Sequence, residues 1–102
     1  MPRIDFIYDR DCAHAEIARE NLIDALSRAL LPCTWTEYCV ADADLPAYAR
    51  GFGSPTVLID TRDVAGAAPG VAPLVRLYDN HRGAPSVEQI LAALETALRL
   101  AS

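Results

Sequence analysis

The chain has 102 residues, of which 52% are hydrophobic and 23% are charged, and its formal net charge is −5. This length suits a single domain, residues 1–102, with one sheet and a few helices. The negative charge and the lack of a basic run argue against a nucleic-acid partner. No apolar stretch is long enough to span a membrane and no signal-peptide core follows Met1, so we expect a cytoplasmic protein without a membrane partner.

The first part of the chain predicts a β-α-β unit. The β-rich run Ile4–Tyr8 reads as a buried strand, and Asp11 can cap the helix that follows it. From Cys12 to Leu31 apolar residues recur at spacings of three and four, which indicates an amphipathic helix that Pro32 ends. Cys33–Val40 is a second strand, and the helical connection predicts that it runs parallel to the first.

The middle of the chain predicts a short helical turn and then a hairpin. Ala43–Arg50 is a helical turn that ends at Gly51, and Thr56–Asp60 is a third strand. We place a tight turn at Thr61–Arg62 and the returning strand at Asp63–Gly66.

A long connection and a helix complete the chain. Ala67–Pro85 is interrupted by several Gly and Pro residues, and Leu74–Tyr78 within it is a candidate for one extra strand. Ser86 and Gln89 form a capping box, and the residues from Val87 to Ala101 carry one apolar stripe at helical spacing.

Cys12 is the first candidate for chemistry, because it lies where an apolar strand ends and a helix begins. The unpaired amide groups and partial positive charge of a helix N-terminus favour thiolate over thiol. Asp9 and Asp11 oppose this ionisation, whereas Arg10 and a protonated His14 favour it. We therefore expect a mildly activated thiol, with His14 as a second candidate that could tune Cys12 or act as an acid and base.

Two patterns resemble the thioredoxin and glutaredoxin superfamily: the strand-to-helix cysteine within Tyr8–Ala15, and Gly53-Ser54-Pro55-Thr56-Val57 before an apolar strand. The resemblance implies an α/β thioredoxin-like fold of order β-α-β-α-β-β-α. It also implies a four-stranded mixed sheet with helices on both faces and an insertion before the last helix. Cys12 then corresponds to the reactive cysteine and Pro55 to a cis-proline, and Ser54 and Pro55 position the incoming thiol substrate.

The chain departs from the two-cysteine pattern at Ala15, where a dithiol oxidoreductase of this superfamily carries its second cysteine. Turnover then requires an external thiol such as glutathione or another cysteine of the chain, or there is no turnover. On one strand, Cys33 and Cys39 would be about 20 Å apart, beyond the about 4.4 to 6.8 Å between Cα atoms that a disulfide tolerates. The parallel strands place Cys39 at the edge of Cys12 and Cys33 at the opposite edge. Cys39 is thus the internal candidate for a resolving thiol, although an unpaired cysteine usually packs in a core.

Other chemistries fit the spacing less well. The three cysteines are an odd number without zinc-finger spacing, so we expect reduced thiols. A zinc site from His14, Cys39 and His81 would join three distant segments, and we predict no metal and no cofactor other than glutathione as a co-substrate. The segment Cys12–Arg19 has six intervening residues, where the phosphate-binding loop of small phosphatases needs five.

Two hypotheses follow from the sequence. The first is monothiol exchange through Cys12 with a protein or small molecule that carries a thiol or a disulfide. The second is a catalytically inactive thioredoxin-like binding module, in which the acidic surface and Ala67–Pro85 meet a partner.

Overall fold

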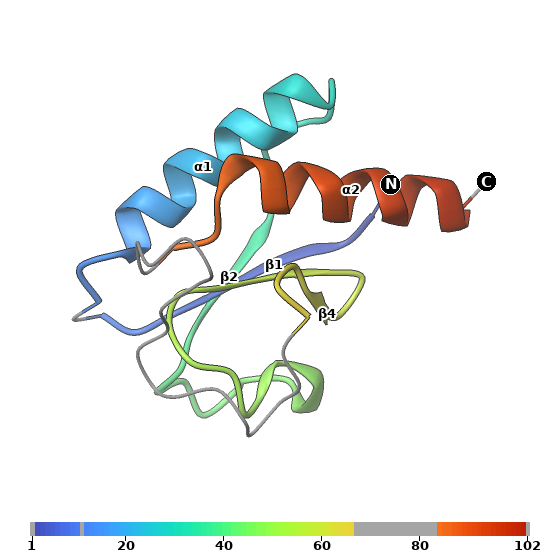
Figure 1. Cartoon of the computed structure of the whole chain (residues 1–102). Coiled ribbons are helices and arrows are strands. Elements are labelled where there is room, and N and C mark those ends of the chain that lie inside the picture. The colour runs from blue at the N-terminus through green and yellow to red at the C-terminus, as the bar shows by residue number, and fades with distance from the viewer. Residues whose placement is uncertain (1, 11, 67–83, 102) are drawn as a thin grey trace.

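The computed structural model of the chain describes residues 2–10, 12–66 and 84–101. In chain order the elements are β1 (Ile4–Tyr8), α1 (Ala15–Arg28), β2 (Thr36–Cys39), the 3-10 helix η1 (Ala47–Ala49), β3 (Thr56–Ile59), β4 (Arg62–Asp63) and α2 (Val87–Ala101) (Figure 1). The expected α/β class is confirmed. The extra strand predicted at Leu74–Tyr78, and most of the insertion that contains it, lie outside the described residues.

The sheet has four strands in the order β2-β1-β3-β4. β1 pairs with β2 in parallel, whereas β1 with β3 and β3 with β4 are antiparallel. The predicted mixed sheet is therefore confirmed. The central strands β1 and β3 are almost completely buried, so they carry mainly apolar residues on both faces, with Asp5 and Thr56 as buried polar exceptions.

Both long helices lie on one face of the sheet (Figure 1). Phe6 and Val57 pack there against Leu22 of α1 and against Ile90 and Leu94 of α2, all five with no more than traces of exposed surface. The other face is covered by the segment around η1, where a smaller cluster is formed by Ile7, Leu45, Ala49, Phe52 and Leu58.

The expectation of helices on both faces is therefore wrong for the two α-helices. The predicted helical turn Ala43–Arg50 shortens to the three residues of η1. Pro46 and Arg50 flank it in extended conformations, and Gly51 follows with φ of 86°. The Ala49 N–H donates to the Pro46 carbonyl at 3.0 Å and the Arg50 N–H to the Ala47 carbonyl at 3.3 Å, so the segment makes a single 3-10 turn.

Helix α1 is shorter at both ends than the predicted Cys12–Leu31. At its start, the Cys12 N–H donates to the Asp9 carbonyl at 3.0 Å, so a turn occupies the residues before Ala15. The N-cap is His14, whose side chain makes no capping hydrogen bond, and the predicted cap Asp11 lies outside the described residues.

At its end, α1 stops before Pro32 through a backbone motif. Leu30 adopts φ of 58°, and its N–H donates to the Ser27 carbonyl at 3.1 Å. The Leu31 N–H donates to the Leu26 carbonyl at 2.9 Å. These two bonds and the left-handed residue between them form a Schellman motif, which ends the helix before proline is reached.

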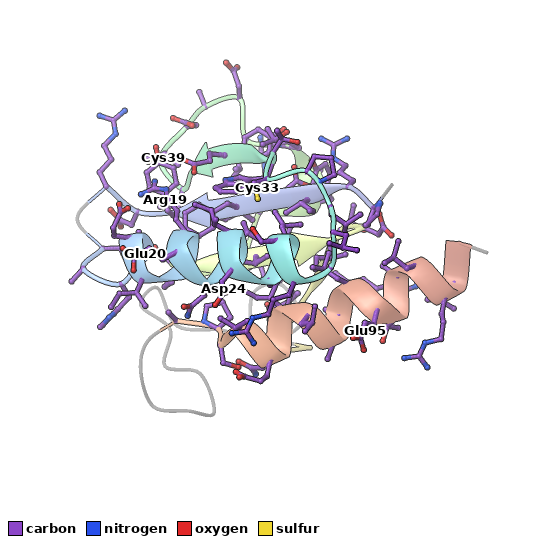
Figure 2. All side chains as sticks on the ribbon, turned by 90° about the horizontal axis from the view of Figure 1, so that it is seen from above. Arg19, Glu20, Asp24, Cys33, Cys39 and Glu95 are labelled. Carbon is purple, nitrogen blue, oxygen red and sulfur yellow. The ribbon has the colours of Figure 1, made fainter. Side chains whose placement is uncertain are left out.

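The predicted strand Cys33–Val40 begins later, at Thr36. The register pairs Asp5 with Thr36 and Tyr8 with Cys39. The residues before Thr36 return the chain from α1, and the Cys33 Sγ lies 3.5 Å from the Ser27 Oγ near the end of that helix. Cys33 and Cys39 therefore do not lie on one strand, so the distance predicted for them from strand geometry does not apply. They do lie at opposite ends of the β-α-β unit, as predicted (Figure 2).

The hairpin turn lies one residue earlier than predicted. Ile59 pairs with Arg62, so the turn residues are Asp60 and Thr61, with φ of 51° and 69°. Arg3, the residue before β1, holds this turn: its carbonyl accepts from the Asp60 N–H, and its N–H donates to the Asp60 Oδ1, both at 2.8 Å. A tertiary contact thus selects the turn residues, and the returning strand ends at Asp63 rather than Gly66.

The capping box of α2 is confirmed. The Gln89 N–H donates to the Ser86 Oγ at 3.1 Å, and the Ser86 N–H donates to the Gln89 Oε1 at 3.2 Å.

Within the described residues, neither helix is of the length and hydrophobicity that crossing a membrane requires.

Candidate functional site

Cys12 lies in the turn between β1 and α1 and is partly exposed. It packs against the core between the sheet and the helices. Its carbonyl accepts from the Ala15 N–H at 3.4 Å. Cys12 therefore precedes the first helical residue by three positions, so the helix end acts on it from outside the first turn, more weakly than the sequence suggested.

The Cys12 turn and the Ser54–Pro55 segment meet in the structure. The Asp9 N–H donates to the Ser54 Oγ at 2.8 Å, a hydrogen bond between residues 45 positions apart in the chain. The peptide bond between Ser54 and Pro55 is cis. The expected juxtaposition of these two segments and the expected cis bond are both confirmed.

Ser54 and Pro55 are both buried. The Thr56 Oγ1 donates to the Gly53 carbonyl at 2.6 Å and so closes the same segment on itself. In this arrangement the Ser54 hydroxyl is engaged by the protein's own backbone rather than presented to solvent. The Ser54 hydroxyl therefore has a structural role: it holds the Cys12 turn through the Asp9 N–H.

The other two thiols differ from Cys12 in their surroundings. Cys39 is 4% exposed and pairs with Tyr8 at the end of β1, so it lies at the edge from which the Cys12 turn starts, as expected. Its N–H donates to the Asp42 Oδ2 at 3.0 Å. Cys33 is exposed. None of the three is in a disulfide.

His14 is partly buried at the start of α1. Across the described part of the chain, no group of three or more His, Cys, Asp or Glu residues is arranged to hold a metal ion. His81, the third member of the zinc combination weighed above, lies outside that part. The structure brings His14 to the same turn as Cys12 but gives it no hydrogen bond from its side chain to the helix.

Other side chains of the protein hold the Arg19 guanidinium. This argues against the phosphate-loop alternative, in which Arg19 would bind a phosphate next to Cys12. Its Nε and Nη2 donate to the two oxygens of Glu37 at 2.9 and 3.1 Å. Its guanidinium carbon lies 5.1 and 4.9 Å from the ring centroids of Phe6 and Tyr8. Sequence reasoning missed this cluster, because it depends on the register that places Glu37 beside Phe6.

The Arg19 cluster also sets the ionisation of Glu37. The Trp35 Nε1 donates to the Glu37 Oε2 at 2.9 Å. Partial burial raises the pKa of Glu37, but hydrogen bonds from Arg19 and Trp35 and the charge of Arg19 outweigh it, so the net direction is downward. A carboxylate with these donors ties β2 to α1 as an ion pair.

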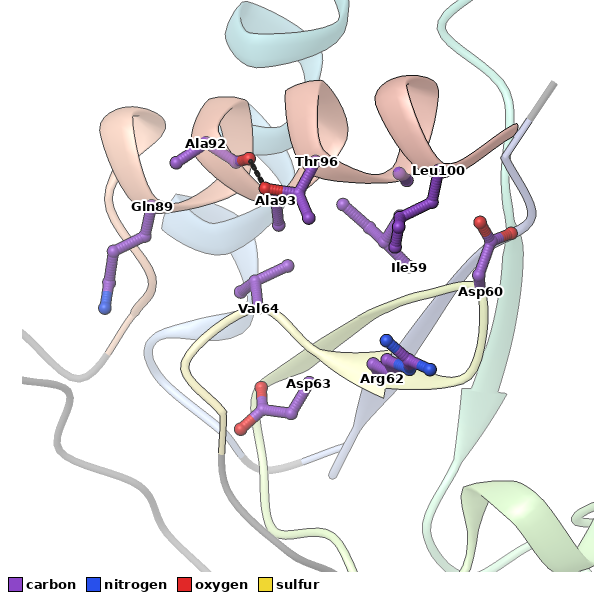
Figure 3. Close-up of a pocket in the computed structure, with 11 residues that line it drawn as sticks. Ile59, Asp60, Arg62, Asp63, Val64, Gln89, Ala92, Ala93, Thr96 and Leu100 are labelled. Carbon is purple, nitrogen blue, oxygen red and sulfur yellow. Dashed lines mark hydrogen bonds between the residues drawn. The ribbon is translucent and has the colours of Figure 1, made fainter. Parts of the chain in front are cut away.

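An apolar groove of about 600 Å³ lies between α2 and the β3–β4 hairpin (Figure 3). Its apolar lining comes from Ile59, Val64, Ala92, Ala93, Ala97 and Leu100. The small alanine side chains on this face of α2 leave the space open. This volume is in the range of small-molecule sites, and nothing in the sequence analysis had pointed to it.

The chain was compared with protein-family models, with curated proteins and with solved structures, and none of them matches it. The resemblance to the thioredoxin superfamily therefore stays a prediction based on the residues themselves.

Proposed function

We propose that this protein is a thioredoxin-like thiol protein that performs monothiol exchange through Cys12. Its partner is a protein or small molecule that carries a thiol or a disulfide. The observation that carries the proposal is the 2.8 Å hydrogen bond from the Asp9 N–H to the Ser54 Oγ. It joins the turn of a partly exposed cysteine to a cis-proline segment, the two features on which the resemblance rests.

The exchange proceeds in two balanced steps. The Cys12 thiolate attacks one sulfur of a disulfide, a new S–S bond forms, and the other sulfur leaves as a thiolate that takes up a proton. An external thiolate, such as glutathione, then attacks the partner sulfur of the mixed disulfide and releases Cys12 as thiolate. After both steps one sulfur of the original disulfide is a free thiol and the other is bonded to the external thiol, so a cycle exchanges one disulfide for another without net oxidation or reduction.

The external thiol is favoured over an internal one by the positions of the other cysteines. Ala15 supplies a methyl group where a dithiol enzyme has its second sulfur, and Cys39 is 4% exposed. Cys33 contacts the far end of α1, beside Ser27. Ser54 acts as a positioning residue, because its hydroxyl is used by the Asp9 N–H.

Mass spectrometry of the native protein treated with oxidised glutathione tests this proposal. Cys33 provides an internal reference, because it is an exposed thiol away from the candidate site. We expect the mixed disulfide to form faster on Cys12 than on Cys33, although Cys12 is less exposed, and reduced glutathione to remove it. A Cys12 that reacts more slowly than Cys33 refutes the proposal.

The positioning role of Ser54 is tested by Ser54→Ala, with Thr96→Ala on the exposed surface of α2 as a control. Loss of the hydroxyl frees the Asp9 N–H, so we expect a changed rate of adduct formation at Cys12 and an unchanged rate at Cys33. An unchanged Cys12 rate in a folded Ser54→Ala variant rejects this role.

A binding module without turnover is the second candidate, and the groove between α2 and the hairpin favours it. The rate of Cys12 alkylation by iodoacetamide, measured against pH, separates the two candidates. A thiolate that reacts in the native state below the pH at which free cysteine ionises supports exchange. If Cys12 reacts only after unfolding, thiol exchange is excluded and the binding module is supported.

A further inference from the structure

The face of the sheet opposite the two α-helices contains a buried carboxylate with an incomplete set of donors. Asp5 of β1 has no exposed surface, and its cross-strand neighbour on this face is Leu58. Its Oδ2 accepts from the Arg3 Nε at 3.3 Å. Its Oδ1 is buried and receives no hydrogen bond within the described residues. An ionised carboxylate is costly to bury unless donors surround it, so this site lacks a donor.

A second buried oxygen on this face is the Tyr48 hydroxyl. Among residues 2–10, 12–66 and 84–101 no hydrogen bond of standard geometry reaches it, but the Tyr38 hydroxyl lies near enough to interact with it. Burial, the nearby Tyr38 hydroxyl and the Asp5 carboxylate raise the pKa of Tyr48 to about 12. Tyr48 is therefore a neutral phenol at ordinary pH, with an oxygen able to accept and a proton to donate.

Arg3, which directly precedes β1, reaches the same region. Its guanidinium carbon lies 5.1 Å from the centroid of the Tyr48 ring. Arg3 and Asp5 are only two residues apart, and the hydrogen bond between them comes from the Nε of Arg3 alone. The Arg3 side chain stays 56% exposed. A guanidinium arriving from outside could instead offer two parallel N–H groups to both carboxylate oxygens, which is the stronger geometry.

We propose that Asp5 and Tyr48 form a binding site for a guanidinium group, which Arg3 fills only in part and covers. The incoming group would donate to both oxygens of Asp5, and it would stack on the Tyr48 ring as Arg3 does. Its source is an arginine side chain of a partner or a small guanidinium compound. The site lies on the opposite face from the cluster that Cys12 packs against, and it does not depend on thiol chemistry.

Chemical rescue of Arg3→Ala by methylguanidinium tests the proposal. The variant removes the donor that the Asp5 carboxylate has within the described residues, so its melting temperature should fall. Methylguanidinium at about ten times its Kd should then raise the melting temperature by about 5 °C or more. The wild type should respond less, because its own Arg3 competes. Arg28→Ala, which removes an exposed partner of Asp24, is the matched control and should show no rescue.

Further arms identify the group and the residues. Equal concentrations of methylammonium and of sodium chloride should not rescue Arg3→Ala, and Arg3→Ala/Asp5→Asn should not respond to methylguanidinium. The peptide Gly-Arg-Gly, compared with Gly-Lys-Gly, shows whether an arginine side chain reaches the site. If Arg3→Ala does not fold, the same measurements are made on Arg3→Gln, which keeps a long side chain at this position. Equal rescue by methylammonium, or rescue that persists without the Asp5 carboxylate, overturns the proposal.

Discussion

Replacing Leu30 by glycine is expected to stabilise the protein. Leu30 is the left-handed residue of the motif that ends α1, with φ of 58°. Its side chain is 92% exposed, so its removal deletes almost no packing. The two hydrogen bonds of the motif, from the Leu30 and Leu31 N–H groups, involve the backbone alone and remain available to glycine.

The size of the effect follows from two opposing contributions. The left-handed conformation costs an L-residue with a Cβ roughly 1–2 kcal/mol, and glycine avoids this cost. Glycine also makes the unfolded chain more flexible, which costs about 0.5–1 kcal/mol. The net gain is about 0.5–1 kcal/mol, equivalent to a rise in melting temperature of about 2–8 °C for a domain of this size.

Thermal unfolding followed by far-ultraviolet circular dichroism measures this gain, and the adjacent residue provides the control. Ala29 has φ of −82°, which suits any L-residue, so Ala29→Gly should lower the melting temperature. Leu30→Asn should raise it, because asparagine tolerates the left-handed region. The reasoning is wrong if Leu30→Gly is no more stable than the wild type, or if Ala29→Gly gains as much.

Three further changes test the packing and the charges. Thr61→Gly should raise the urea midpoint by the equivalent of about 0.5 kcal/mol, because Thr61 is β-branched with φ of 69°; an unchanged midpoint contradicts this. Leu94→Ala should cost about 2–5 kcal/mol in urea unfolding, since Leu94 has no exposed surface, and a cost under about 1 kcal/mol would place it outside the core. The pKa of Glu37 is lowered in the folded state, so its ion pair with Arg19 stabilises the fold above the ordinary value of 4.5 and is lost as the pH falls through the folded pKa. The wild type should therefore lose its advantage over Glu37→Gln in that acid range, and an advantage in unfolding free energy that does not change with pH would exclude this origin.

Local sequence determined the order of the elements and several of their details. The apolar stripe of α2 and its capping box need only residues three and four positions apart, so they could be identified directly. The bounds of β1 were predicted as observed because they follow from a short local run of strand-favouring residues. The juxtaposition of Cys12 and Ser54–Pro55 came from a superfamily pattern and not from local physics, yet the hydrogen bond between Asp9 and Ser54 agrees with it.

Only the tertiary structure decided features that depend on strand register and on distant contacts. The hairpin turn is set by Arg3, which holds Asp60 through two hydrogen bonds across 57 positions of the chain. The pairing of Arg19 with Glu37 requires that β2 lie beside β1 in one register. The burial of Ser54 and of Asp5 likewise depends on what covers each face of the sheet. A residue's spacing along the chain specifies its own helix or strand, whereas its partners and its exposure are specified only when those elements pack together.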